Sequence, residues 1–106
     1  MQQTKLKLTI SAHSTVALDS LIEKVVSDPL NYDTDADKLH MAALNEILFI
    51  IKPKICFFEP KYKLKLSATQ CFALRLLFLY TDIIGEHFKN EMLQICNTIH
   101  QSFSKN

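Results

Sequence analysis

The stretch from Lys61 to Ile84, KYKLKLSATQCFALRLLFLYTDII, changes its hydrophobic period from that of a strand to that of a helix. Within Tyr62–Leu66, lysines alternate with leucines, so a strand would place the leucines on one face and the lysines on the other. Ser67 stands three residues before Gln70, which is the spacing of a capping box at a helix N-terminus. The stretch therefore predicts a strand that leads directly into a helix at Ser67.

The helix predicted after Ser67 runs from Ala68 to about Ile84 and is the most apolar one in the chain. Gly85, the only glycine of the sequence, follows it at a position where helices often end in a left-handed residue. With a rotation of about 100° per residue, one side of this helix gathers only apolar residues. They are Phe72, Leu76, Leu79, Tyr80 and Ile83, with Ala73, Leu77 and Ile84 beside them. The opposite arc is mostly polar but also holds Cys71, Leu74 and Phe78.

A helix that is apolar on all sides is either central in its own domain or covered by a second chain. We predict the second arrangement, in which Cys71, Leu74 and Phe78 bind a protein partner. A homodimer is its simplest form, because a twofold interface uses the same patch twice. In the alternative, the helix is central and the rest of the chain wraps around it.

The chain begins with a second strand-to-helix transition in Lys5–Ile22, KLKLTISAHSTVALDSLI. Its KLKLT segment, Lys5–Thr9, matches KLKLS 58 residues later, and each half of the chain is predicted to contain a strand and two helices. The candidate halves are residues 4–52 and 53–104 of a single domain, and the two KLKL strands would lie close together. A chance match is the alternative, since lysine and leucine are common in this sequence.

Three further helices are predicted from apolar residues at helical spacing, at Thr15–Ser27, Asp35–Ile51 and Glu86–Ser102. Pro29 and Pro53 are expected to end the first two, because the residue before a proline avoids the helical conformation. An apolar, β-prone segment and a turn-like tripeptide precede the KLKL strand, which predicts a hairpin. The expected fold is α+β and mainly α. About four helices pack on one face of a two- or three-stranded sheet of Lys5–Thr9, Ile55–Phe58 and Tyr62–Leu66.

The bulk composition bounds the class of protein. The length of 106 residues suits one ordinary domain, and 48% hydrophobic residues are enough for a core. A net charge of +1 argues against a function that depends on a large net charge. No apolar run approaches the about 20 residues of a membrane helix, and the N-terminus has no apolar signal core. We expect a cytoplasmic protein that does not enter a membrane.

The sequence offers no metal-binding pattern. Cys56, Cys71 and Cys96 occur without a close pair, so free thiols are expected rather than disulfides or a zinc site. The acidic loop Pro29–Asp37 lacks the glycine and the final glutamate of a calcium loop, so its acids are expected to cap the next helix. His40 lies within an apolar helix face and is expected to be hydrogen-bonded there. We expect no metal and no cofactor.

The sequence also offers little for catalysis. Phosphate-binding loops and nucleophile elbows need glycines for close backbone approach, and the chain has one glycine. His87 and Glu91 form an i, i+4 pair, which is expected to be a surface interaction rather than an acid–base couple. The leading interpretation is a small non-enzymatic interaction module, an adaptor or subunit that acts through its apolar helix surface.

A lysine-rich segment supports an alternative function, nucleic-acid binding. Five lysines cluster between residues 52 and 65 with one opposing glutamate, and three aromatic residues, Phe57, Phe58 and Tyr62, are interleaved among them. Lysines combined with aromatic rings bind single-stranded nucleic acids, but lysines on exposed strands also prevent edge-to-edge aggregation. Two lysines of the N-terminal strand would extend the patch across the sheet. The candidate nucleic-acid-binding residues are Lys5, Lys7, Lys54, Lys61, Lys63 and Lys65.

Overall fold

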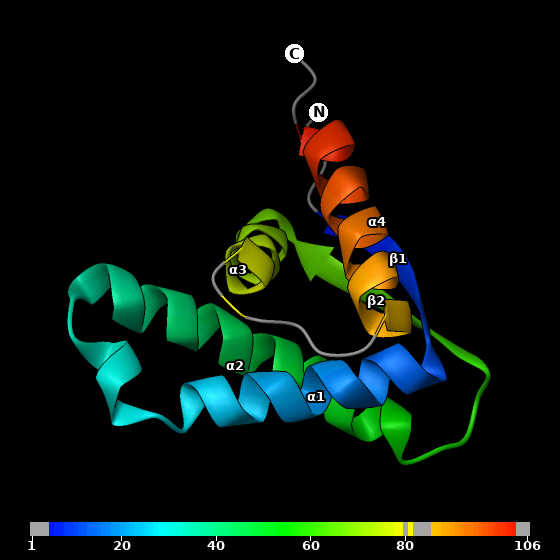
Figure 1. Cartoon of the computed structure of the whole chain (residues 1–106), viewed down its shortest axis with the longest axis horizontal. Helices are drawn as coiled ribbons and strands as arrows, with labels where there is room; N and C mark the ends of the chain where they lie inside the picture. The colour runs from blue at the N-terminus through cyan, green and yellow to red at the C-terminus, as the bar shows by residue number, and fades with distance from the viewer. Residues whose placement is uncertain (1–4, 80, 82–85, 104–106) are drawn as a thin grey trace.

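The computed structural model describes residues 5–79, 81 and 86–103. Its elements, in chain order, are β1 (Lys5–Ser11), α1 (Ala12–Val26), the 3-10 helix η1 (Pro29–Tyr32), α2 (Asp35–Ile55), β2 (Lys61–Ser67), α3 (Ala68–Leu79) and α4 (Glu86–Phe103). Figure 1 shows α1 and α2 side by side as an antiparallel pair, with α3 and α4 on the same side of that pair as the strands. The fold is a mainly helical α+β fold, as the sequence predicts.

The two strands form an antiparallel sheet, although the whole α1–α2 hairpin separates them along the chain. The register places Leu8 opposite Leu64 and Leu6 opposite Leu66. Alternate residues on both strands are buried, and the helices pack on this inner face. The opposite face of the sheet is exposed and carries the lysines of both strands. The prediction that the two KLKL strands lie close together is therefore confirmed.

Local capping explains where the helices begin. The backbone N–H of Gln70 donates to Ser67 Oγ (3.2 Å) and the Gln70 side chain accepts from the Ser67 N–H (3.0 Å), which is the predicted capping box. Thr34 and Asp37 form the same reciprocal pair at the start of α2. Ser11 caps α1 by accepting from the Ser14 N–H. Both strands therefore pass directly into helices.

The core lies between the inner face of the sheet and the four helices. Each half of the chain follows the order strand, helix, helix, and both halves contribute to this one core. The largest fully buried apolar side chains are Ile10, Leu18, Ile22, Leu44, Ile47, Ile51, Leu64, Leu66, Leu74, Met92 and Ile99. The hairpin between α1 and α2 is fixed by Tyr32, whose hydroxyl donates to the Val26 carbonyl at 2.6 Å.

The predicted strand Ile55–Phe58 is wrong, and so is the predicted hairpin. Helix α2 continues through Pro53 to Ile55, and β2 pairs with β1 instead. A proline removes one hydrogen bond, here to the Phe49 carbonyl, but its fixed φ is helical. Pro53 and Phe49 are both exposed, so water can satisfy that carbonyl, while Ile51 and Ile55 still pack on the core. Packing of Ile55 against the core favours a helix that continues past Lys52.

The predicted end of the third helix is only partly described. Helix α3 runs to Leu79, and Thr81 is in a bend. The predicted last helical turn at residues 82–84 and the predicted terminating residue Gly85 lie outside the described residues.

Candidate functional site

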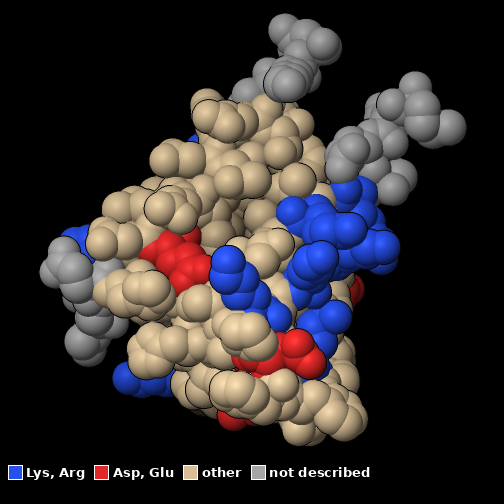
Figure 2. All heavy atoms as spheres, turned by 90° about the vertical axis from the view of Figure 1, so that its right-hand side faces the viewer, with Lys and Arg blue, Asp and Glu red and all other residues tan. Residues whose placement is uncertain are grey.

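The exposed face of the sheet carries five lysines. The antiparallel register brings Lys7 opposite Lys65, and it places Lys63 opposite Thr9 and Lys61 opposite Ser11. We call this surface the lysine face, and it consists of Lys5, Lys7, Lys61, Lys63 and Lys65. Figure 2 shows lysine and arginine side chains gathered in one group on the right of the view. Five of the six candidate nucleic-acid-binding lysines therefore lie together on one surface.

The lysine face is electrostatically unusual for a chain with a net charge of +1. Like charges directly opposite each other on a sheet are destabilising, and Lys7 and Lys65 are such a pair. Alternate residues along a strand lie about 7 Å apart. Within the part of the chain that the structure describes, Lys7, Lys61, Lys63 and Lys65 form no ion pair. The face therefore presents a row of positive charge to solvent.

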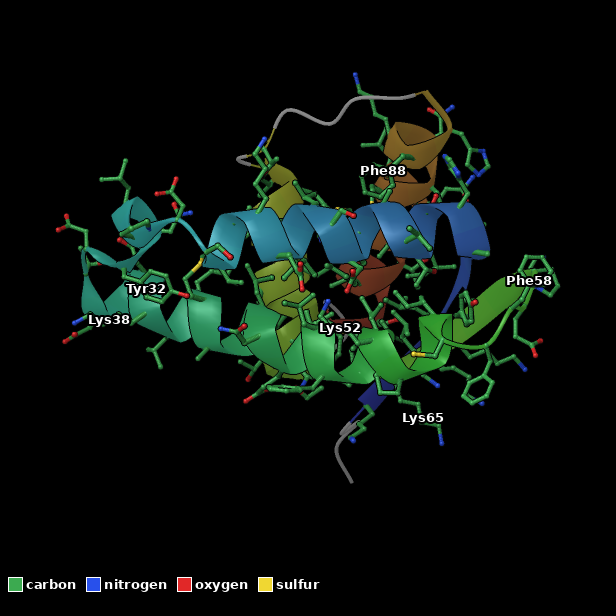
Figure 3. All side chains as sticks on the ribbon, turned by 90° about the horizontal axis from the view of Figure 1, so that it is seen from below. Tyr32, Lys38, Lys52, Phe58, Lys65 and Phe88 are labelled. Atoms are coloured by element: carbon green, nitrogen blue, oxygen red, sulfur yellow. The ribbon has the colours of Figure 1, made fainter. Side chains whose placement is uncertain are left out.

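Two other lysines of the 52–65 cluster lie outside this face. Lys52 bridges α1 and α2, where its ammonium group contacts Asp19 at 3.2 Å and also Glu23 (Figure 3). The hydrogen bond to Glu23 is the main cause that raises the pKa of Lys52 above its ordinary value. Lys54 is exposed in the last turn of α2, close in sequence to the loop that leads to β2.

The three interleaved aromatic residues take two different positions. Tyr62 points to the inner face of the sheet, where it is buried and its hydroxyl donates to the Phe57 carbonyl at 2.7 Å. Phe57 and Phe58 lie in the loop between α2 and β2 and remain 73% and 91% exposed. Of the three aromatic residues, Tyr62 is therefore buried on the opposite side of the sheet from the lysines, and only Phe57 and Phe58 are exposed.

The predicted partner-binding residues do not form an outer arc. Cys71 and Leu74 are fully buried in the core, and Phe78 is half-buried against it. The arrangement of residues around the helix axis predicted the wrong core-facing side of α3. This helix is apolar on all sides, so the elements packed against it decide which side is buried. His40 of α2 illustrates this, since its Nε2 lies 2.8 Å from the Ala73 carbonyl. The expected hydrogen bond of His40 is confirmed, and it ties α2 to α3.

The exposed apolar side of α3 is the side that the sequence predicted to face the core. Phe72 and Leu76 are exposed there, and Leu39 of α2 is exposed beside them. These three side chains, which we call the α2–α3 strip, line a shallow groove of about 340 Å³. The Phe72 ring also packs against Phe103 of α4, with ring centroids 5.4 Å apart.

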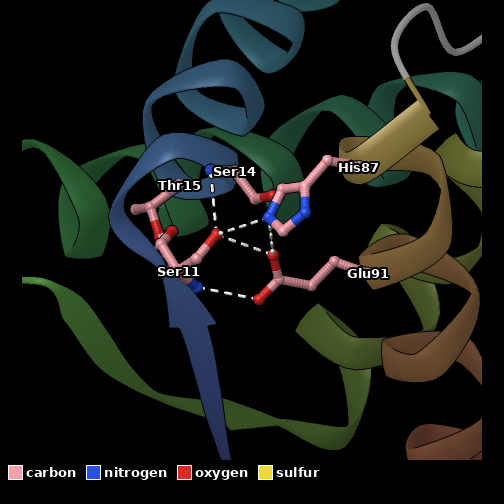
Figure 4. A network of polar contacts seen from close by, with 5 residues as sticks. All are labelled: Ser11, Ser14, Thr15, His87 and Glu91. Carbon is pink, nitrogen blue, oxygen red and sulfur yellow. Dashed lines mark hydrogen bonds and ion pairs between the residues drawn. The ribbon is translucent and has the colours of Figure 1, made fainter.

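A polar network joins α4 to the junction of β1 and α1 (Figure 4). Glu91 accepts from the Ser11 backbone N–H at 2.8 Å and from the Ser11 hydroxyl at 2.7 Å. His87 Nε2 lies 3.5 Å from Ser11 Oγ and 3.6 Å from Glu91 Oε1. A catalytic triad needs the carboxylate on the opposite ring nitrogen from the serine, so this geometry differs from one. The network instead extends the cap of α1.

The electrostatics of this network favour an ionised carboxylate. Burial of Glu91 raises its pKa. Three influences lower the pKa and together outweigh burial: the hydrogen bonds from Ser11, the nearby hydroxyl of Ser14 and the charge of His87. The pKa of Glu91 is therefore below its usual range. The Ser14 hydroxyl is buried beside the carboxylate without meeting hydrogen-bond geometry, so we assign most of the lowering to Ser11. Sequence reasoning identified the His87–Glu91 pair but not its contact with Ser11, which is 80 residues away.

The three cysteines are unpaired, as predicted. Burial raises the pKa of Cys71 to about 11. Burial also raises the pKa of Cys96, and the charge of Arg75 opposes this shift. A protonated thiol is a weak nucleophile, so neither sulfur is activated at neutral pH. No cluster of three or more metal-ligating side chains occurs among the described residues.

Comparisons with known proteins add no further information on the site. Searches of protein-family models, of curated proteins and of solved structures find no match to this chain. Among the helices in the described part of the chain, none has both the length and the apolar character needed to cross a membrane.

Proposed function

We propose that this protein is a non-enzymatic binding module that holds nucleic acid on its lysine face. The observation that carries the proposal is the gathering of five lysines on one exposed sheet face, two of them directly opposite each other. Mutual repulsion of these charges costs stability, and a polyanion would relieve it. Lys7 and Lys65 are the centre of this surface.

The chemistry of lysine favours binding through phosphates. Its ammonium group is a compact point charge, whereas sequence readout favours the planar, bidentate guanidinium of arginine. The chain has one arginine, Arg75, which lies on α3 and not on the sheet. Phosphate contacts fix register and affinity but carry no sequence information. The proposed binding is therefore independent of base sequence and driven by the release of counterions.

Protection of exposed strands from aggregation is the competing role for these lysines. Both strands of a two-stranded sheet have an open edge, so lysines would discourage the addition of a third strand. This role requires charge but no ligand. It predicts that the lysine face binds no nucleic acid and that neutralised variants aggregate.

The proposal is tested by replacing Lys63 and Lys65 with glutamine. Each lost phosphate contact reduces the magnitude of the slope of log affinity against log salt by about 0.7–0.9, so the double variant should lose up to about 1.8 of that magnitude. Affinity should fall by similar factors for all base sequences. The measurement is fluorescence anisotropy of labelled oligonucleotides in a salt series.

The matched control replaces two exposed lysines outside the face, Lys24 and Lys38, with glutamine. This control changes the net charge by the same amount and should bind almost as the wild type does. An equal loss in both double variants would contradict a localised site. Absence of binding by the wild type at low salt would leave only the protective role. Equal competition by poly-glutamate would indicate an acidic protein as the partner instead.

The second candidate function is self-association through the α2–α3 strip. It retains the predicted class of a dimeric interaction module but moves the surface away from Cys71, Leu74 and Phe78. The specific observation in its favour is that Leu39, Phe72 and Leu76 form a contiguous exposed groove on two helices. A twofold axis would bury this strip twice.

This candidate predicts a concentration-dependent dimer that Leu39→Glu dissociates. Burial of a leucine is worth about 1.5–3 kcal/mol, and twofold symmetry doubles it, so the dissociation constant should rise about 100-fold or more. Light scattering after size exclusion at several concentrations measures the mass. Leu30→Glu, at an exposed leucine of η1, is the control and should leave the mass unchanged. A wild type that is monomeric at every concentration would refute self-association.

A further inference from the structure

The loop at one end of the lysine face carries a pair of exposed aromatic rings. Resting on the proposed nucleic-acid binding, we infer that Phe57 and Phe58 stack with unpaired bases and make this surface selective for single strands over duplexes. The rings would hold bases while the lysine face holds phosphates. This division of contacts is the one by which single-stranded nucleic acids are bound without regard to sequence.

The first support is the exposure of the two rings on a fixed backbone. They are 73% and 91% exposed, although the loop beneath them is well anchored. The Phe57 N–H donates to the Lys54 carbonyl at 3.2 Å, and the Phe57 carbonyl accepts from the Tyr62 hydroxyl at 2.7 Å. The Pro60 carbonyl accepts from the Ala12 N–H at 3.0 Å. Because the loop backbone is already ordered, only the side-chain torsions of the two rings would lose freedom when a base stacks on them.

The second support is continuity with the lysine face. Lys61 follows the loop directly and forms the last pair of the sheet, opposite Ser11. Lys54 precedes the loop and is also exposed, so a lysine stands on each side of the aromatic pair in the sequence. Figure 3 shows Phe58 at the end of the molecule where β2 begins, on the right of the view, with Lys65 at the lower edge of the view. A strand that follows the lysine face toward Lys61 would therefore reach the rings.

The third support is a hollow beside Phe58. Its volume is about 590 Å³, and it is lined by Phe58, by His13 and Val16 of α1, and by Tyr62 of the inner sheet face, so it lies around the loop from the lysine face. The lining is largely apolar and includes the aromatic rings of Phe58, His13 and Tyr62. Unpaired bases are bound in this way, splayed out and stacked on aromatic side chains. The hollow adds a place for a base next to the stacking surface.

The expected preference for single strands over duplexes follows from the accessibility of the base faces in each ligand. In a duplex the base faces are already stacked, so the loop meets only phosphates and sugars. In a single strand each base has an accessible π-face, and stacking on an aromatic side chain increases affinity for any base. The lysine face would contribute to both complexes, whereas Phe57 and Phe58 would contribute only to the single-strand complex.

The test compares two labelled probes, a single-stranded oligothymidine of about 24 nucleotides and a blunt-ended duplex of about 12 base pairs, which has nearly the same number of phosphates and no unpaired bases. The wild type should prefer the single strand. Phe57→Ala with Phe58→Ala should lower single-strand affinity by about five- to 100-fold per stacked base and leave duplex affinity within about twofold. The variant keeps the anchoring hydrogen bonds, because the loop contacts of Phe57 come from its backbone. Circular dichroism should show an unchanged fold.

Phe49→Ala is the matched control, since it removes a ring that is 79% exposed on α2 and outside the lysine face. It should change neither affinity. Lys63→Gln with Lys65→Gln should lower both affinities, which separates this inference from the function on which it rests.

Three outcomes would overturn the inference. If the phenylalanine variant lowers both affinities equally, or neither, while the lysine variant lowers both, stacking is wrong and the lysine-face proposal stands. If the wild type binds neither probe at low salt, both are wrong. If vesicles containing phosphatidylserine displace the oligonucleotide, and the phenylalanine variant loses only vesicle binding, the two rings insert into a membrane surface instead.

Discussion

Leu74→Glu is expected to unfold this protein rather than to release a soluble monomer. Leu74 is fully buried in the middle of α3, surrounded by side chains of the sheet and the other helices. Replacing a buried leucine by alanine costs about 2–5 kcal/mol, and an unpaired buried carboxylate costs more. Domains of this size are stable by only about 5–15 kcal/mol in total. The glutamate variant should therefore lose its cooperative thermal transition.

Leu74→Ala and Leu79→Glu make this experiment quantitative. The alanine variant should fold with reduced stability, measured by urea unfolding followed by circular dichroism. Leu79→Glu places the same charge on an exposed position of the same helix and should unfold close to the wild type. If Leu74→Glu instead gave a folded monomer with an unchanged transition, while the wild type was a dimer, Leu74 would lie in an interface. The central position of α3 would then be wrong.

Patterns that depend on neighbouring residues were predictable from the sequence. The alternation in Tyr62–Leu66 defines the exposed and buried faces of β2, because side chains alternate along a strand. The capping box at Ser67 and Gln70 marks the start of α3. The similar KLKL segment near the N-terminus predicts the partner strand, so most of the lysine face was predicted by residue number.

The orientation of α3 was not predictable from its own residues. An amphipathic helix has one apolar side, which identifies the side that faces the core. Helix α3 is apolar on every side, so the choice depends on what packs against it. In the structure, the contact between His40 and the Ala73 carbonyl helps to place α2 on one side, and Phe72 is left exposed. As a result, the side of α3 predicted to bind a partner faces the core, and part of the side predicted to face the core is exposed.

The end of α2 was mispredicted because a general rule was opposed by tertiary packing. Residues before a proline avoid the helical conformation, but the preference is modest compared with burial of a large side chain. Ile55 packs against the core, and it can do so only because the helix continues past Pro53. The partial burial of Ile55 cannot be predicted from the local sequence, because it depends on where the sheet lies.

Glu91→Ala is expected to loosen α4 from the rest of the fold. The carboxylate accepts two hydrogen bonds from Ser11, one from the backbone N–H and one from the hydroxyl, and its side chain is only 18% exposed. Hydrogen bonds to a charged group contribute about 1.5–3 kcal/mol, and loss of the acceptor leaves the partly buried Ser11 N–H unpaired. The alanine variant should therefore lose about that free energy of unfolding at neutral pH.

Glu91→Gln separates the charge from the hydrogen bonds. Glutamine keeps one oxygen that accepts from the Ser11 N–H, and its amide can donate to Ser11 Oγ, so the cost should be smaller than for alanine. The two variants are compared by urea unfolding at a series of pH values. Glu59→Gln, at an exposed carboxylate in the loop before β2, is the control and should follow the wild type.

The pH dependence has a defined sign, because the pKa of Glu91 is lower in the folded protein than its ordinary value of 4.5. The stabilisation that comes from its charge is complete above that value, where the carboxylate is ionised in both states. As pH falls below 4.5, the unfolded chain takes up the proton first, and the stabilisation is lost as pH passes through the lower folded-state pKa. The stability difference between the wild type and Glu91→Gln should therefore be present at neutral pH and shrink in acid. A difference that stayed constant down to pH values well below 4.5 would show that the Glu91 charge does not hold α4 against Ser11.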